Sequence, residues 1–451
     1  MLATMPLPPS SQKRIGALVL LFAACVLSTA HAQDPRSQFD RFRSMRYGIF
    51  IHNVYKLSGE PDGMPYQTPE EFAELFDVHA FADQMASIGV EYVIFTAWHY
   101  RMYCLGPNAA LDRWLPGHTT KRDLIGEVAD ALDTKGIGLV IYAHPNDGHD
   151  LHTEEQTRVG YVRFDKSLPQ PMPLFNDFIN EVYAEFAERY SHKPNVLGFW
   201  WDSWAADGNR IDARRLRDTV RTKFPGAIIV SNSWGPGWGK PVDVSCVELN
   251  TPQTSDDIDL FLARKTHQTT TFQGTWWRGN AQAAGTPKFG AETIFRVTVL
   301  NAGAGAPGGM CWATSPLADG KTWGSDGEPL RTLVQVGGSL KPIRESVCGV
   351  APSKNWLLSD RTTFSMAPAY VATRSFDGTK EYVHVLKPPS GRSLVLGKPE
   401  ERFGSARLLR NGHVVSMDQQ PAHVRLTLGE HDQWDLLDTV IVLEIGEESD
   451  D

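Results

Sequence analysis

Two acidic side chains, Asp202 and Glu248, stand where a carboxylate could do chemistry. Asp202 directly follows the apolar run Leu197–Trp201, and Glu248 ends a run that begins at Val242. A carboxylate is costly to bury unless it is paired or functional. Taken singly, Asp202 could cap a helix and Glu248 could be a solvated loop residue. Taken together, they are the pair that cleavage of a glycosidic bond needs, since that chemistry uses two carboxyl groups in unlike environments, one ionised and one protonated.

Histidines and aromatic residues follow other apolar runs in the same way. Aromatic faces stack on the C–H surfaces of sugars, and polar side chains fix the hydroxyl groups. Each histidine could instead be a packed or capping residue, and each tryptophan a core residue. The substrate-contacting candidates are His52, His99, Tyr100, Tyr142, Trp234 and Trp276.

One further group, His144, His149 and His152, lies in a single segment after an apolar run. Three imidazoles this close could hold a metal ion. No acid-rich partner sequence accompanies them, so we expect no metal site, and nothing else in the chain indicates a cofactor.

The elements that must position these residues alternate between strand and helix from about residue 45 to 315. Thr68 with Pro69 predicts a capped helix start, and Gly89 and Gly136 predict helix ends. Eight strands with intervening helices predict a (β/α)8-like barrel, a TIM barrel, over residues 33–340, although weakly patterned helices after the fifth strand could make its second half irregular. The predicted strands are Tyr47–His52, Tyr92–Thr96, Ile137–Tyr142, Val196–Trp201, Ala227–Val230, Val242–Glu248, Thr269–Thr275 and Gly309–Trp312.

After about residue 345 the alternation of strand and helix ends, and short strands separated by turn residues follow. Asp377-Gly378 and Asn411-Gly412 are hairpin signals. Residues 345–451 therefore predict a C-terminal antiparallel β-sandwich. Its predicted strands are Trp356–Ser359, Ala369–Ser375, Glu381–Leu386, Ser393–Leu396, Arg407–Leu409, His423–Leu428 and Thr439–Ile445.

Residues 1–32 have the three-part order of an export signal. A basic start that ends at Arg14 precedes the apolar run Ile15–Ser28, and Ala30 and Ala32 provide small residues for cleavage. The run is shorter than the ~20 residues that a bilayer requires. We expect a periplasmic or secreted protein with no membrane span. Four cysteines remain after the leader, and their spacing does not decide whether disulfides form.

Composition restricts the class of partner. Hydrophobic residues make up 41% of the chain, which suits a packed globular protein, and the net charge is -9. A nucleic-acid-binding protein normally carries a basic stripe, so we expect a glycan or glycoside as partner and no nucleic acid. The oligomeric state stays open.

Several of these segments together resemble the α-L-fucosidases of glycoside hydrolase family 29. The similar motifs are Arg46–His52, Gly89–His99 with its continuation Tyr103–Leu105, Arg122–Glu127, Phe199–Asp202 and Asp243–Glu248. The resemblance covers roughly residues 38–320, and the family's C-terminal β-sandwich fits the remainder. It implies that Asp202 is the nucleophile and Glu248 the general acid and base of a retaining exo-glycosidase acting on terminal α-L-fucosyl or related sugars. Glu60 would take the role of a hydroxyl-binding glutamate of the family.

The sequence also departs from the family pattern. Asn53 follows the first histidine where the family has tryptophan, Tyr100 replaces the second of two histidines, and Ser233 stands where bacterial members carry an arginine. In the family these side chains contact the fucose hydroxyls, so the departures concern the sugar more than the reaction. Two alternatives stay open: a catalytically silent carbohydrate-binding relative, and a glycosidase of the same fold for another sugar such as α-galactose.

Overall fold

The computed structural model describes residues 37–56, 64–162, 172–202, 211–232, 242–249, 267–272, 287–324, 327–356 and 369–446. These belong to one compact unit that begins at Ser37. The expected leader lies outside the described residues. No helix among the described residues has both the length and the apolar character needed to cross a bilayer.

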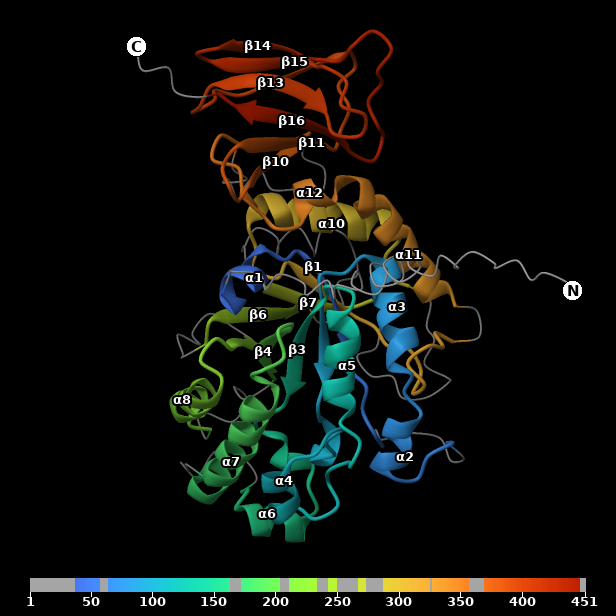
Figure 1. Ribbon diagram of the computed structural model, residues 1–451, viewed down its shortest axis with the longest axis vertical. Helices are drawn as coiled ribbons and strands as arrows, with labels where there is room; N and C mark the ends of the chain where they lie inside the picture. Colours follow the sequence, from blue (N-terminus) through green and yellow to red (C-terminus); the bar gives the residue numbers. More distant parts are fainter. Residues whose placement is uncertain are drawn as a thin grey trace, which may run out of the picture. The chain divides into compact units, whose positions relative to one another are not determined.

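Eight parallel strands close into a barrel in chain order, and β1 pairs with both β2 and β8 (Figure 1). Each expected strand is present with bounds within a few residues, so the predicted barrel is confirmed. Parallel strands are covered on both faces, which explains why they read as continuous apolar runs. The strands are β1 Tyr47–Ile51, β2 Tyr92–Thr96, β3 Gly138–Ala143, β4 Val196–Trp201, β5 Ile228–Asn232, β6 Val244–Leu249, β7 His267–Thr271 and β8 Met310–Ala313.

Helices surround this barrel and pack on one another around it. α3 contacts both α5 and α11, α11 contacts α10, and α7 contacts α4 and α8. Gly89 adopts the left-handed conformation that ends α3, as the sequence predicts. The helices are α1 Gln38–Ser44, α2 Pro69–Glu74, α3 Val78–Ile88, α4 Ala109–Trp114, α5 Leu124–Asp133, α6 Thr153–Val159, α7 Pro173–Tyr190, α8 Ala213–Lys223, α10 Ala291–Ala304, α11 Glu328–Leu340 and α12 Arg344–Val347. Short 3₁₀ turns are η1 Tyr100–Met102, η2 Asp147–Asp150 and η4 Lys341–Ile343.

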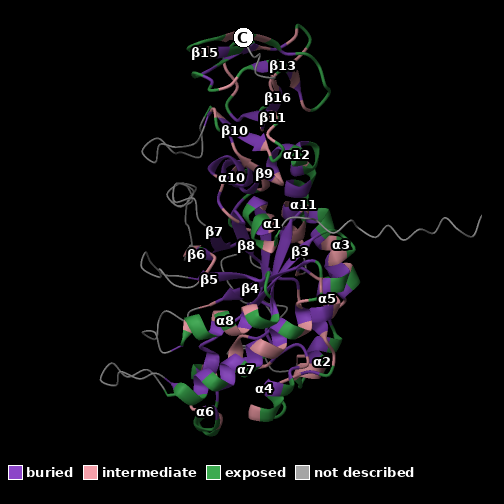
Figure 2. Cartoon of the chain, turned by 60° about the vertical axis from the view of Figure 1, so that its left-hand side comes forward, coloured by how far each residue is buried: buried purple, intermediate pink, exposed green. Residues whose placement is uncertain are grey.

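Side chains alternate between the barrel interior and the helical layer. In every barrel strand except β6 both sets are buried, and buried residues are purple in Figure 2. In β5, Ile228 and Val230 belong to the interior cluster, whereas Ile229 packs with the helices. This period of two means that the next interior position of β5 is Asn232. The interior cluster comprises Phe42, Phe50, Tyr92, Ile94, Val140, Tyr142, Leu197, Trp200, Ile228, Val230, Val244, Cys246, Cys311 and Ala313.

The alternation in β4 is shifted by one residue at Gly198. Leu139 pairs with Val196 but Val140 pairs with Gly198, so β4 carries one extra residue there. Leu197 and Trp200 consequently both face the interior, three residues apart instead of two. Asp202, two residues after Trp200, therefore also takes an interior position, where an unshifted strand would turn it toward the helices.

Two antiparallel sheets form the C-terminal part, as the sequence predicts. One has the order β13-β16-β11-β10-β9 and the other β12-β15-β14, and a second apolar cluster lies between them. Of the predicted strands, only the first is not observed: Trp356 lies in a bend, and residues 357–359 lie outside the described ones. The strands are β9 Val350–Pro352, β10 Tyr370–Ser375, β11 Lys380–Val385, β12 Ser393–Leu396, β13 Phe403–Leu408, β14 Ser416–Gln420, β15 His423–Thr427 and β16 Thr439–Ile445.

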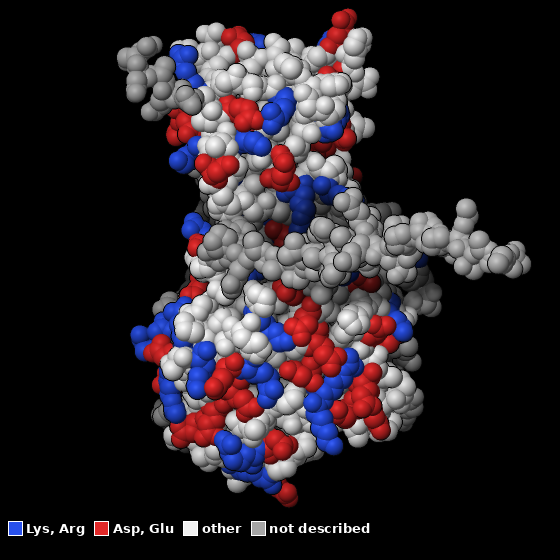
Figure 3. Space-filling model, viewed as in Figure 1, with Lys and Arg blue, Asp and Glu red and all other residues white. Residues whose placement is uncertain are grey.

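Charged side chains of both signs are interspersed on the face shown in Figure 3. Many form local ion pairs, such as Lys193 with Asp130 at 2.7 Å and Arg113 with Glu181 at 2.6 Å. The cysteines among the described residues are Cys104, Cys246, Cys311 and Cys348. None of them forms a disulfide, a point that the sequence left open.

The extra residue in β4 gives a test of this geometry. Gly198 has φ +147°, and a Cβ atom there would lie 2.1 Å from the Ile228 carbonyl oxygen. We expect Gly198→Ala to lower the free energy of unfolding by about 3–4 kcal/mol, because backbone strain and overpacking act together. Urea unfolding measures this value.

Gly136→Ala is the matched control, since Gly136 has φ +68° but no atom within 4 Å of the added Cβ. It should lose only the cost of the left-handed conformation, about 1–2 kcal/mol. Equal losses in the two variants would contradict the steric account of Gly198.

Candidate active site

Polar side chains from six consecutive strands gather at the carboxyl ends of the barrel. His52 follows β1, His99 comes three residues after β2, Tyr142 lies in β3, and Asp202 follows β4. Asn232 ends β5, and Glu248 lies in β6, two residues beyond the interior side chain of Cys246. Because parallel strands all end at the same face, segments far apart in sequence meet there.

Asn232 joins the two carboxylates directly. Its Nδ2 atom donates to Asp202 Oδ1 at 2.8 Å and to Glu248 Oε2 at 2.6 Å. One nitrogen therefore uses its two hydrogens on two acids. Asp202 Oδ1 and Glu248 Oε2 can therefore be no farther apart than the sum of these two distances. That upper limit is within the ~5.5 Å separation of the two carboxyl groups in retaining glycosidases.

The environment of Glu248 favours its protonated form. Burial raises the pKa of this carboxyl group to about 7, and the negative charge of Asp202 acts in the same direction, whereas the hydrogen bond from Asn232 opposes the shift. A carboxylic acid with this pKa still holds a proton near neutral pH and can deliver it.

Asp202 is held by two donors from neighbouring strands. Besides Asn232, the Tyr142 hydroxyl donates to Asp202 Oδ2 at 2.7 Å. Burial and the charge of Asp202 raise the pKa of Tyr142 well above its usual value, so the phenol keeps the proton that it donates. The Tyr142 ring is itself fixed by stacking on Trp200, with ring centroids 5.5 Å apart. Both carboxylate oxygens of Asp202 thus have set directions.

Two neutral imidazoles complete the described wall of the site. The His52 ring stacks on Phe50, with ring centroids 4.1 Å apart, and makes an edge contact with Tyr142, with ring centroids 5.2 Å apart. His99 stacks on Tyr142 at 5.8 Å. Burial lowers the pKa of His52 to about 3, against the opposing charge of Asp202. Burial and neighbouring histidines lower the pKa of His99 well below its usual value. Neutral imidazoles can both donate to and accept from hydroxyl groups.

The structure brings together five of the residues selected from the sequence: Asp202, Glu248, Tyr142, His52 and His99. Tyr100 differs, because the contact described for its ring is with the Arg101 guanidinium at 5.1 Å. The candidates Glu60, Trp234 and Trp276, and also Ser233, lie outside the described residues.

Sequence reasoning missed Asn232 and the buried residue Asp147. Asn232 is a short polar residue at the end of an apolar strand, and the only available signal was its position two residues after Val230. Asp147 stands between His144 and His149, and its spacing from these histidines could have indicated an acidic partner for them. Both residues stand out only when burial and contacts are known.

Comparisons with known proteins bear on the family and the fold of the chain. A family model described as Alpha-L-fucosidase matches residues 29–286, which is more than half of the chain. The sequence matches none of the curated proteins with which it was compared.

Several solved structures have a similar fold. A bacterial fucosidase with a monovalent iminocyclitol inhibitor has a TM-score of 0.66 and 19% identity, covering 92% of this chain and 96% of that chain. Alpha-L-fucosidase isoenzyme 1 from Paenibacillus thiaminolyticus has a TM-score of 0.64 and 20% identity, covering 91% and 99%. A trapped covalent intermediate of an alpha-L-fucosidase from Bacteroides thetaiotaomicron has a TM-score of 0.65 and 18% identity, covering 92% and 97%. At these identities the likeness concerns the fold.

The bridging amide yields a prediction about Glu248. Asn232→Ala removes the hydrogen bond that stabilises the ionised carboxylate, so we expect the pKa of Glu248 to rise above its value of about 7. NMR titration of glutamate labelled at the side-chain carbon measures this shift.

Asn355→Ala is a close control, because Asn355 Nδ2 also donates to two carboxylates, those of Glu381 and Glu401, each at 3.1 Å. That variant should leave the titration of Glu248 unchanged. A Glu248 pKa that stays the same or falls in Asn232→Ala would contradict the role given to the bridge.

Proposed function

The chain belongs to the alpha-L-fucosidase family of glycoside hydrolases, and from this premise we propose that it is an exported, retaining exo-glycosidase. Its substrates are glycans or glycosides that end in α-L-fucosyl or closely related residues. The observation that carries the proposal is the pair of carboxyl groups, Asp202 and Glu248, hydrogen-bonded to one amide nitrogen at the mouth of the barrel.

Asp202 is the nucleophile in this proposal. One of its oxygens forms a bond to the anomeric carbon, while the bond from that carbon to the leaving oxygen breaks. The hydrogen bonds from Tyr142 and Asn232 orient the carboxylate. The covalent intermediate trapped in the Bacteroides thetaiotaomicron protein is the corresponding species in a relative, and supports the double displacement proposed here.

Glu248 is the general acid and then the general base. Its proton passes to the leaving oxygen in the first step. In the second step the resulting carboxylate takes a proton from the water that attacks the anomeric carbon, while the bond from that carbon to Asp202 breaks. The pKa of about 7 supports the first role, because the acid form predominates below that pH. Once the leaving group has departed, Glu248 carries the negative charge that the second role requires.

His52, His99 and Tyr142 lie together at the carboxyl ends of the strands and would contact the hydroxyl groups of the sugar. Their fixed, neutral rings suit an uncharged ligand with donors and acceptors. Trp234 or Trp276 would provide the stacking face, and Glu60 a further hydroxyl partner. The leader expected in residues 1–32 supports export of the enzyme to the periplasm or out of the cell.

The first experiment is a panel of nitrophenyl glycosides that includes the α-L-fucoside and the α-D-galactoside. We expect release of nitrophenol from the fucoside, and Asp202→Asn should lower kcat at least about a thousandfold while the protein stays folded. Circular dichroism checks the fold. Preference for the galactoside would revise the sugar and keep the mechanism.

Binding of a glycan without turnover of any substrate would support the carbohydrate-binding alternative, which the departures at Asn53 and Tyr100 motivate. Near-normal turnover by Asp202→Asn would reject the nucleophile.

Glu248→Ala separates the acid from the nucleophile. A nitrophenolate leaves without a proton, so formation of the covalent intermediate from an aryl glycoside needs the acid less than cleavage of a sugar–sugar linkage does. We expect kcat/KM to fall at least tenfold more for a fucosylated oligosaccharide than for the aryl fucoside. Equal losses on the two substrates would count against Glu248 as the acid.

A further inference from the structure

Asp147 is a fully buried acid to which the mechanism proposed above assigns no role. Its side chain is 0% exposed, and neither carboxylate oxygen has a hydrogen-bond partner in the described part of the chain. A buried carboxylate without hydrogen bonds is costly, and such groups are normally paired or coordinate a metal. The position of Asp147 therefore requires an explanation beyond packing.

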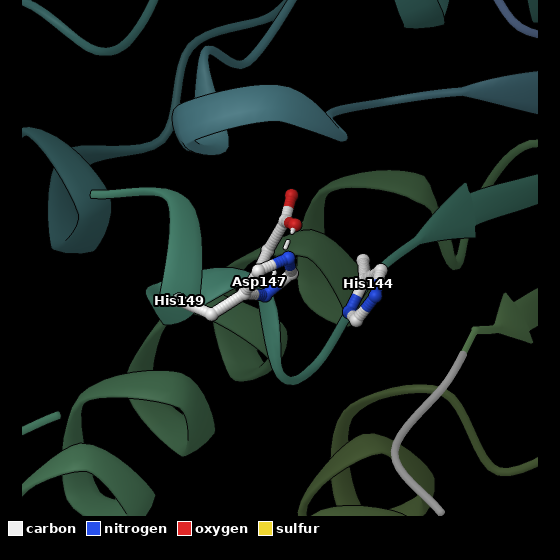
Figure 4. Close-up of side chains that lie close together, drawn as sticks. All are labelled: His144, Asp147 and His149. Carbon is white, nitrogen blue, oxygen red and sulfur yellow. Dashed lines mark ion pairs between the residues drawn. The ribbon is translucent and has the colours of Figure 1, made fainter. Parts of the chain in front are cut away.

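Nitrogen and oxygen donors surround this carboxylate. One ligand atom from each of His144, Asp147 and His149 lies within 4.8 Å of the others, and the same is true of His99, Asp147 and Asp150. Asp147 Oδ1 is 3.9 Å from His99 Nδ1 and 4.0 Å from His149 Nδ1. Figure 4 shows that His144 lies at the end of β3, whereas Asp147 and His149 come from the turn that follows.

We propose that His144, Asp147 and His149 bind a divalent transition-metal ion of the zinc type, with His99 or Asp150 able to supply a further ligand. Imidazole and carboxylate are ligands that zinc accepts, and two histidines with one acid are a common set. Ligand atoms in a tetrahedral zinc site lie about 3.3 Å apart when the bonds are about 2.0–2.1 Å. An ion would thus draw these side chains together by roughly 1 Å.

The hydrogen bonds of the two histidines bear on this geometry. His149 Nδ1, which is 4.0 Å from Asp147 Oδ1, also lies 3.1 Å from the Asn146 carbonyl oxygen. The ion binds this nitrogen in place of that contact, or it binds Nε2 while the contact is kept, as in many metal sites. Asp150 Oδ1 lies 3.3 Å from this Nε2 atom, so it is well placed to join. His144 Nδ1 accepts from the Asn146 backbone N–H at 3.2 Å, a long bond that coordination would replace.

The site would act on the reaction through His99. The His99 ring stacks on Tyr142 on one side and meets His144 edge-on at 5.4 Å on the other. An ion held at Asp147 would therefore fix the wall of the sugar site without touching the anomeric carbon. This is a positioning role, separate from the two catalytic carboxyl groups.

The test measures zinc binding and needs no enzyme assay. Tag-free protein, stripped with a chelator, is dialysed against micromolar zinc chloride, and bound metal is determined by mass spectrometry. We expect one zinc ion per chain and a rise in melting temperature with zinc concentration. His149→Ala, which removes a half-exposed side chain, should weaken zinc binding at least tenfold. Asp147→Asn should abolish it.

His152→Ala is the matched control. His152 lies in the same segment, contacts Arg101 at 2.9 Å and belongs to neither group of ligands, so zinc binding should be retained. The proposal is overturned if the wild-type protein takes up no zinc, or if His149→Ala binds zinc as tightly as His152→Ala. If Asp147→Asn fails to fold, the comparison of His149→Ala with His152→Ala still tests whether the zinc site exists. Because the experiment measures zinc binding and not activity, a negative result would not bear on the proposed hydrolysis.

Discussion

A single amide nitrogen, Nδ2 of Asn232, is hydrogen-bonded to both acids of the candidate site, and the proposed chemistry depends on that arrangement. Asp202 and Glu248 belong to different strands, and each would repel the other if both were ionised. The amide holds them at a fixed separation, while burial raises the pKa of Glu248 to about 7, so that this carboxyl group is still partly protonated at neutral pH. Every other described part of the site supports this pair. Tyr142 occupies the second oxygen of Asp202, Trp200 fixes the ring of Tyr142, and the closed barrel keeps the strand ends in register.

Much of the fold could be predicted from the sequence, for a physical reason. Strands buried on both faces are short apolar runs, and the turn residues around them mark their ends, so all eight barrel strands were found. Elements without that signal were not. Helix α10 is buried around most of its surface and shows little amphipathic pattern. Strand β14, Ser416–Gln420, is polar and largely exposed, and only its pairing with β15 makes it a strand.

The site was predictable to a similar extent. Asp202, Glu248, His52 and His99 lie in motifs that resemble a known family, and their places at strand ends agree with the barrel. Asn232 and Asp147 could not be selected in that way, because a single asparagine at a strand end or a single aspartate in a turn is ordinary until its contacts are known. Their importance comes from burial and from neighbours supplied by other segments. For Tyr100, which follows His99 in the sequence, the contact described for its ring is with Arg101.

The extra residue at Gly198 has an evolutionary consequence. The number of residues between Leu197 and Asp202 determines which of the two neighbouring tryptophans faces the barrel interior. It also determines whether the side chain of Asp202 faces the interior or the helical layer. Loss or gain of one residue in this interval would keep the Trp-Trp-Asp motif intact in the sequence but would turn its aspartate toward the helical layer. Homologues should thus be compared by the length of this interval as well as by its sequence, because a relative could retain the motif and still lack an aspartate at the candidate site.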